Sequence, residues 1–284
     1  MWKNRPGLVK IKEIKMIRKI MAVVFALMLA VSLGWLGAIA WQENVSGADH
    51  DEAAQLANAS PATVSAELSA TGKIYVDDAA RVNVYTDDQI DELRDMDIEA
   101  LRKVNSEVMG WIRIPDTEID YPLLWGEDNE HYLKHNWKNK PNSAGAIFME
   151  HANTADLSDF NTIIYGHNMR SGSMFGGLKE YGSQAYWEAH PHIYILHDNS
   201  VFRYDIFAAH RVRPGTITYA MQIPTQLQAE FICCALENSK IQTNIRPAVG
   251  DRILTLSTCT GDSAYRWVVQ GVLNQEQSYH KDLP

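Results

Sequence analysis

After Gly110 the chain consists mainly of short runs of β-branched, aromatic and aliphatic residues separated by turn residues, and this pattern restricts the fold more than any other feature. Runs of about four to eight such residues, bounded by turn residues, are typical of strands. Eight are recognised, at residues 111–114, 118–124, 145–149, 162–165, 192–196, 201–208, 252–258 and 267–273. Eight short strands predict a mainly β domain built as a closed or nearly closed barrel.

Helices are expected at three places around these strands. Thr86 and Asp87 are N-cap candidates, and apolar residues then recur at helical spacing up to about residue 108, which predicts a helix or a helix pair that caps the domain. Two further helical stretches interrupt the strand runs, near residues 174–189 and 223–239. We therefore assign residues 86–284 to one folded domain.

The segment from residue 20 to residue 41 contains no charged residue. A helix of this length covers the hydrocarbon core of a bilayer, which is roughly 30 Å thick. Residues 1–19 carry seven basic side chains and one acidic side chain, so the positive-inside rule predicts a cytoplasmic tail, a single transmembrane helix and an extracellular remainder. The alternative is a cleaved signal peptide, since Ala38-Ile39-Ala40 offers small residues at a suitable spacing. Both interpretations place the rest of the chain outside the cytoplasm.

Charge and composition describe the remainder of the chain. The formal net charge is −9, and because residues 1–19 contribute +6, everything after them sums to −15. Such an acidic body does not suit a nucleic acid as partner. Residues 42–85 are rich in Ala, Ser, Asp, Asn and Thr with little apolar periodicity, which favours an extracellular linker without a packed core.

The chain has three cysteines, and their positions differ in chemical interest. Cys233 and Cys234 are adjacent, which is poor geometry for a disulfide between them, and they are expected in a helix as small apolar residues. Cys259 ends a predicted strand and is followed by the turn residues Gly261, Asp262 and Ser263. A thiol reacts as the thiolate, whose formation near neutral pH needs a nearby base or cation.

Arg266 and His167 are the partners that we assign to Cys259. Arg266 begins the next predicted strand, so the two residues flank one short loop, and a permanently charged guanidinium suits a developing oxyanion. His167 is chosen among ten histidines because the buried run Asn161 to Gly166 delivers it to a strand end. The structural alternative is a buried strand cysteine with a surface arginine. An HxH metal pair at His190 and His192 is also considered, although no HExxH or CxxC motif supports it.

Three motifs resemble those of class B sortases: residues 161–169 (NTIIYGHNM), residues 174–178 (MFGGL) and residues 255–260 (TLSTCT) with Arg266 after them. The resemblance runs in order from about Thr86 to Asn274. It implies an eight-stranded sortase-type β-barrel with an N-terminal helical cap and an extra helix before the nucleophile strand. It also implies that Cys259, His167 and Arg266 are catalytic, and the neighbouring Thr258, Thr260, Asn168 and Tyr265 are expected to bind substrate. The loop from Cys259 to Arg266 is a few residues shorter than expected for class B, which bears on substrate preference.

The resemblance implies a membrane-anchored cysteine transpeptidase. Such an enzyme cleaves a C-terminal sorting motif after Thr through a thioacyl-enzyme, and it transfers the surface protein to an amine of a cell-wall precursor or of a pilin subunit. No cofactor and no metal are expected, since the chain shows no EF-type loop or dense carboxylate cluster. A secreted thiol hydrolase with the same residues and a non-catalytic surface binding module are the alternatives.

Overall fold

The computed structural model describes residues 21, 28–29, 31–33, 47–59, 88–259 and 264–279. The chain divides into two compact units, Met1–Val45 and Ser46–Pro284. Most of the predicted membrane span at residues 20–41 lies outside the described residues. The residues of this span that the structure describes are helical. No helix among the described residues is long and apolar enough to cross a bilayer.

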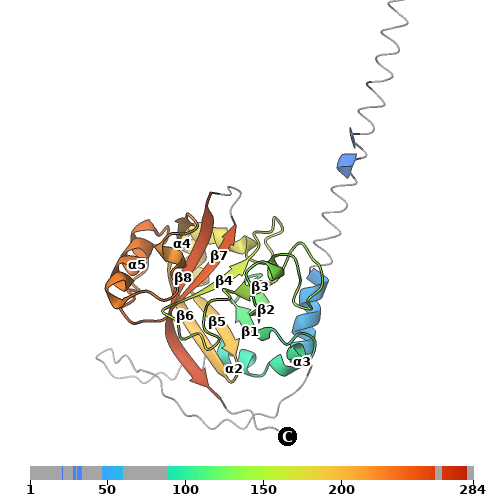
Figure 1. The fold of residues 1–284 in the computed structure, drawn as a ribbon, viewed down its shortest axis with the longest axis horizontal. Coiled ribbons are helices and arrows are strands. Elements are labelled where there is room, and N and C mark those ends of the chain that lie inside the picture. The colour runs from blue at the N-terminus through green and yellow to red at the C-terminus, as the bar shows by residue number, and fades with distance from the viewer. Residues whose placement is uncertain are drawn as a thin grey trace, which may run out of the picture. The chain divides into compact units, whose positions relative to one another are not determined.

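Eight strands form a closed barrel in the second unit, in the order β1-β2-β3-β4-β7-β8-β6-β5 (Figure 1). The strands are β1 (Val108–Arg113), β2 (Asp120–Leu124), β3 (Ile147–Met149), β4 (Asn161–Gly166), β5 (His192–His197), β6 (Ser200–Val212), β7 (Ile253–Cys259) and β8 (Arg266–Ser278). Each overlaps one of the eight predicted runs. The expectation of a mainly β barrel is therefore confirmed.

Two pairings in the barrel are parallel, β2 with β3 and β4 with β7, and the other six are antiparallel. The β4–β7 pair is continuous from Asn161↔Ile253 to Gly166↔Thr258. Because the two strands run in the same direction, both end at the same rim of the barrel.

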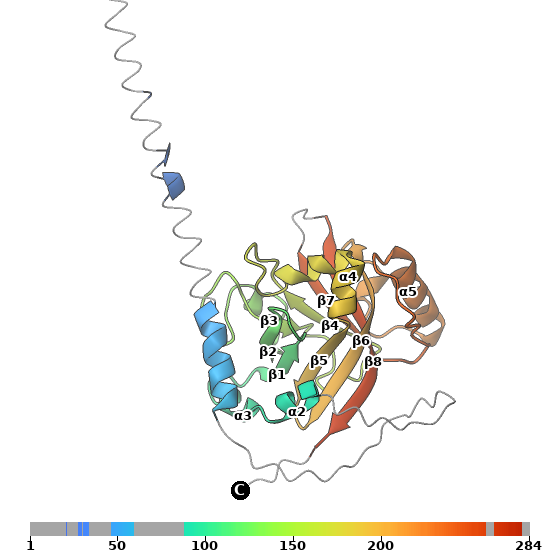
Figure 2. The same cartoon turned by 180° about the vertical axis from the view of Figure 1, so that it is seen from behind.

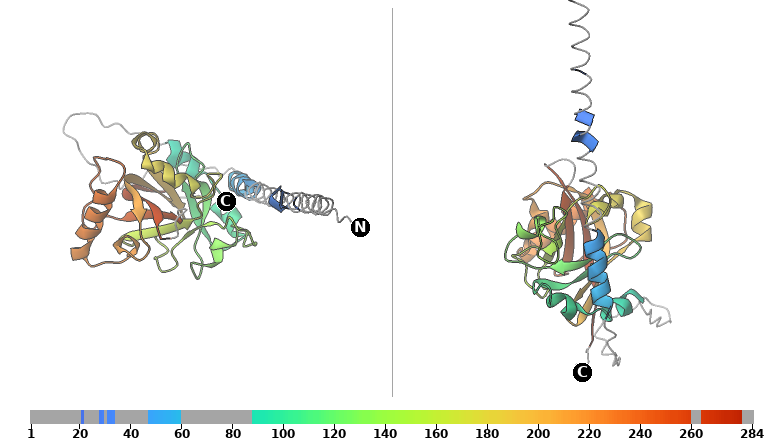
Figure 3. Two further views of the ribbon diagram at one scale, coloured as in Figure 1. Left: turned by 90° about the horizontal axis from the view of Figure 1, so that it is seen from above. Right: turned by 90° about the vertical axis from the view of Figure 1, so that its right-hand side faces the viewer.

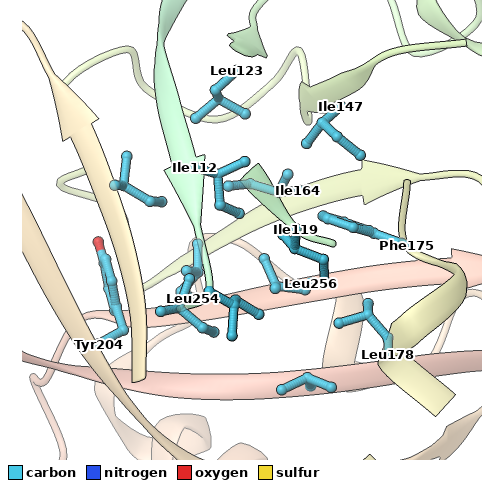
Figure 4. Close-up of a cluster of buried hydrophobic side chains, with 14 of the residues drawn as sticks. Ile112, Ile119, Leu123, Ile147, Ile164, Phe175, Leu178, Tyr204, Leu254 and Leu256 are labelled. Atoms are coloured by element: carbon cyan, nitrogen blue, oxygen red, sulfur yellow. The ribbon is translucent and has the colours of Figure 1, made fainter. Parts of the chain in front are cut away.

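Apolar side chains that point inward from the strands fill the barrel. Ile112, Ile164, Leu254, Leu256 and Tyr204 belong to this core and are at most 1% exposed, and Figure 4 shows them together with Phe175 and Leu178 from the segment after β4. Because successive side chains of a strand point to opposite faces, every second residue of each strand faces this core and the residues between them face the outside of the barrel.

Helices cover the outside of the barrel. The expected N-terminal pair is present as α2 (Asp88–Arg94) and α3 (Ile98–Arg102), and the expected helix before the last two strands is α5 (Thr225–Asn238). The stretch predicted near 174–189 contains the 3₁₀ helix η2 (Gly176–Gly182) and α4 (Gln184–Ala189); two further 3₁₀ turns are η1 (His131–Leu133) and η3 (Ile217–Tyr219). Figure 2 shows α5 on the side of the barrel that carries β6 and β8, away from α3. Cys233 and Cys234 lie on α5, where Cys233 is exposed rather than packed.

Residues 47–58 form a helix that belongs to the second unit and packs against α2, α3 and β1 there, which differs from the linker expected over residues 42–85 (Figure 3). Ala53 and Ala57, one helical turn apart, are fully buried in a cluster that includes Leu93, Leu101, Trp111 and Trp137. The backbone carbonyl of Ala57 also accepts a hydrogen bond from the amide of Asp97, at 2.7 Å. Small residues pack closely without adding a hydrophobic pattern, which is why the composition favoured a linker.

Candidate active site

The ends of three neighbouring strands bring His167, Cys259 and Arg266 to one rim of the barrel. His167 follows Gly166, the last residue of β4, and Gly166 pairs with Thr258 of β7. Cys259, the last residue of β7, pairs with Arg266, the first residue of β8. The three predicted catalytic residues, of which His167 is far from the other two in the chain, thus occupy adjacent positions across β4, β7 and β8.

A backbone carbonyl holds the imidazole of His167. The ring is half-buried, and its Nε2 lies 2.8 Å from the carbonyl oxygen of Leu133, at the end of η1. A carbonyl oxygen only accepts hydrogen bonds, so Nε2 carries the proton and donates it. In the neutral ring Nδ1 then bears the free lone pair, which makes Nδ1 the atom that can exchange a proton with a reacting group.

Gly145 leaves room for this histidine. Its φ is +64°, in the left-handed region that favours glycine, and a Cβ placed there would lie 3.0 Å from Cδ2 of His167 and 2.4 Å from the carbonyl oxygen of Tyr132. A larger residue would therefore displace the segment that carries Leu133.

Arg266 and Tyr265 lie together at the start of β8. Nη1 of Arg266 donates to the carbonyl oxygen of Tyr265 at 3.0 Å, so the guanidinium lies beside the backbone that leads into the strand. The ring of Tyr265 is covered by the guanidinium groups of Arg211 and Arg213, at 4.5 and 5.5 Å from its centroid. The guanidinium groups of Arg211, Arg213 and Arg266 therefore gather around the start of β8.

The face of β7 opposite to the core residue Leu256 carries a set of polar residues that sequence reasoning missed. Ser257 lies on this face because successive residues of a strand point to opposite sides. The hydroxyl of Ser257 lies 2.8 Å from that of Tyr219, at the end of η3, and Ser257 pairs with Tyr165 of β4. Tyr219 joins this face only through the fold, so no local pattern identifies it.

Tyr165 and Glu150 extend this polar set. The hydroxyl of Tyr165 donates to Oε2 of Glu150 at 2.9 Å. Burial and the neighbouring carboxylate raise the pKa of Tyr165, which keeps the phenol neutral. Burial opposes the ionisation of Glu150, but hydrogen bonds from Asn129 and Tyr165 prevail and lower its pKa. A neutral hydroxyl and a fixed carboxylate therefore lie along this face.

The four predicted substrate-binding residues differ in position. Tyr265 and Asn168 are half-buried next to Arg266 and His167, and Asn168 forms an isolated bridge with Met174. Thr258 is 3% exposed and lies two residues after Leu256, so its side chain shares the face of Leu256 that meets the barrel core. Thr260 lies outside the described residues.

His190 and His192, the considered metal pair, each have a structural partner. Nδ1 of His190 lies 3.0 Å from the carbonyl oxygen of Pro115, and Nδ1 of His192 lies 2.8 Å from Oδ1 of Asp205. Among the described residues, no group of three or more His, Cys, Asp or Glu side chains is arranged to hold a metal ion.

Comparison with known proteins agrees with this geometry. The sortase domain model matches residues 112–274. Sortase B of Listeria monocytogenes is 39% identical over 204 residues, which cover 70% of this chain and 80% of that protein. Its solved structure superimposes with a TM-score of 0.56, over 61% of this chain and 98% of that one. A Staphylococcus aureus sortase B–substrate complex gives a TM-score of 0.59 at 29% identity, over 62% of this chain and 83% of that one.

The matched region contains all eight strands, in whole or in part, and also His167, Cys259 and Arg266. The resemblance found in the motifs therefore extends over the whole barrel. The chain therefore belongs to the sortase family, in its class B, and is a cysteine transpeptidase of the sortase type.

Proposed function

We propose that this sortase is anchored in the cell membrane, cleaves the sorting motif of exported proteins after Thr, and joins the new carboxyl end to an amine of a cell-wall precursor or a pilin subunit. Cys259 is the nucleophile, His167 the acid and base, and Arg266 the cation for the oxyanion. The observation that carries the proposal is the pairing of β4 with β7 and of β7 with β8, which brings these residues together.

The first half of the reaction forms the thioacyl-enzyme. As the sulfur of Cys259 attacks the carbonyl carbon of Thr, Nδ1 of His167 accepts the thiol proton, and the negative charge that develops on the carbonyl oxygen is stabilised by Arg266. When the C–N bond breaks, His167 gives its Nδ1 proton to the departing amine. The Nε2 hydrogen bond to Leu133 supports this assignment because it orients Nδ1 for the transfer.

The second half reverses these roles with a different amine. The incoming amine attacks the thioester carbon, His167 accepts its proton, and the C–S bond breaks to release Cys259 and the new amide. The acceptor must reach the same rim, so we place both substrates on the face of β4 and β7 that carries Tyr165, Ser257 and Tyr219. The hydroxyls on this face provide partners for the polar backbone of an extended peptide.

Anchoring is proposed from the apolar segment at residues 20–41. Its described members are helical and have exposed apolar side chains: Met21, Met28, Leu29, Val31 and Leu33, between 47 and 72% exposed. Contiguous apolar surface of this kind suits a lipid environment. The basic tail then lies in the cytoplasm and the catalytic domain lies outside, where sorting substrates and lipid-linked acceptors meet.

Mass spectrometry of the protein with a library of sorting peptides tests the proposed chemistry. We expect a thioester adduct on Cys259 and, when an amine is added, a new amide product in place of the free acid. The Cys259→Ala variant should give neither product while keeping its circular dichroism spectrum. Turnover in that variant would refute the assignment of the nucleophile, and release of free acid at all amine concentrations would indicate a hydrolase.

A further inference from the structure

The first turn of helix 47–58 is bonded to the segment between β2 and β3. Oδ2 of Asp49 accepts hydrogen bonds from the side-chain amides of Asn136, at 2.7 Å, and Asn142, at 3.4 Å. The carbonyl oxygen of Asp49 accepts from the indole of Trp137, at 2.7 Å, and the ammonium of Lys138 lies 3.4 Å from Oδ1. One residue of this helix thus binds four residues of one segment.

That segment is the one that holds the catalytic imidazole. Leu133, whose carbonyl oxygen accepts from Nε2 of His167, lies only three residues before Asn136. The segment is folded back on itself by the bond from the amide of Asn142 to the carbonyl of Lys134, at 2.8 Å. A shift of the residues that Asp49 binds is therefore transmitted to the carbonyl of Leu133 through a short and hydrogen-bonded stretch of chain.

His50, the next residue, is linked through Tyr121 to the loop that follows His167. Its ring lies edge-on to Tyr121, with 4.5 Å between the ring centroids. The hydroxyl of Tyr121 accepts a hydrogen bond from the amide of Met174, at 2.9 Å. The amide of the following residue, Phe175, donates to the carbonyl of His167 at 2.9 Å and closes the loop that begins at the histidine.

We infer that helix 47–58 is part of the catalytic apparatus, with Asp49 and His50 as positioning residues for His167. Asp49 acts on the ring through Leu133, and His50 acts on the loop after the ring through Tyr121 and Met174. The inference rests on the proposed role of His167. Displacements as small as about 1 Å can reduce catalysis on the order of a hundredfold, so contacts of this kind can control the rate without touching the substrate.

The test uses the full chain with Asp49→Ala and, as the control, Gln55→Ala, which changes an exposed polar side chain on the same helix. One readout is the exchange of the Nε2 proton of His167 with solvent, followed by NMR. The other is the pH dependence of iodoacetamide alkylation at Cys259, quantified by mass spectrometry of the peptide that contains it. Neither readout requires knowledge of the sorting motif.

In Asp49→Ala we expect about tenfold faster exchange of the Nε2 proton and a shifted pH profile of alkylation, while Gln55→Ala matches the wild type. Asp49→Asn keeps an acceptor for Asn136 and should fall between them, which keeps the test valid if the alanine variant unfolds. Wild-type exchange and alkylation in both Asp49 variants would overturn the inference. The proposed function fails in a different way, through activity that survives His167→Ala.

Discussion

At the residue scale, the proposed acid–base and oxyanion groups predict a sharp contrast among substitutions. His167→Ala and Arg266→Ala should each reduce kcat/KM by roughly a hundredfold or more, because each removes a group that acts in the transition state. His190→Ala and His192→Ala should change it by less than about threefold, since these rings contact Pro115 and Asp205 rather than the rim. Steady-state kinetics with one sorting peptide gives all four values, and an essential His192 together with a dispensable His167 would contradict the assignment.

Tyr219→Phe tests the proposed substrate face. The variant loses only the hydroxyl that contacts Ser257, so we expect the peptide KM to rise about two- to tenfold with a smaller change in kcat. Tyr279→Phe, which changes a tyrosine hydroxyl near Asp198, is the matched control and should behave as wild type. Equal kinetics in the two variants would remove Tyr219 from the substrate face.

The sequence points to the proposed catalytic residues more clearly than to the groups that surround them. Cys259 and His167 stand at the ends of recognisable strands, so local patterns lead to them. Leu133 contacts His167 through its backbone carbonyl, and because every residue has this group, the amino-acid sequence does not single out position 133. Tyr219 meets Ser257 across 38 positions of chain, and such a contact depends on the tertiary fold alone.

At the element scale, helix 47–58 should contribute to stability as well as to the site. We expect a chain that begins at residue 60 to lose roughly 3 to 5 kcal/mol of unfolding free energy relative to one that begins at residue 46. This loss corresponds to the buried methyl groups of Ala53 and Ala57 and to about three hydrogen bonds. Urea denaturation of the two chains measures the difference. Identical midpoints and slopes would show that the helix does not contribute to the stability of the folded domain.

All eight strands were predicted, but two of them continue at least four residues beyond the C-terminal ends of their apolar runs. β6 continues to Val212 and β8 to Ser278, where the two strands pair with each other as far as Ser200↔Ser278. The last part of β8 contains Asn274, Gln275, Glu276 and Gln277, so the alternation of apolar residues that marks a strand is missing there. Its pairing is set by β6, which a local pattern cannot show.

At the scale of the whole molecule, buried His50 makes stability depend on pH. Burial lowers the pKa of His50 to about 4, although the carboxylates of Asp49 and Asp51 act in the opposite direction. The third neighbour, Tyr121, has a pKa raised to about 12 by burial and stays neutral here. In the unfolded chain the pKa of a histidine is near ~6.5. Between pH 4 and this value the unfolded chain binds more protons than the folded one, so the contribution of His50 to the free energy of unfolding is fully present above about pH 6.5 and is lost as the pH falls.

We expect a loss on the order of 1 to 3 kcal/mol between pH 6.5 and pH 4, measured by urea denaturation at several pH values. His50→Phe should flatten this dependence, while part of it remains because burial also lowers the pKa of His210. Carboxylates with lowered pKa values, such as Asp205, lose their contribution at more acidic pH and do not interfere. The same slope in wild type and His50→Phe would exclude His50 as the source.

The parallel pairing of β4 with β7 also determines when the enzyme becomes active. Cys259 follows His167 by 92 positions, and β7 must enter the sheet between β4 and β8 before the two residues meet. Pairings between such distant segments form late and slowly during folding. A chain whose barrel has not yet closed therefore keeps the two residues apart, and the proposed chemistry can begin only after β7 has joined the sheet.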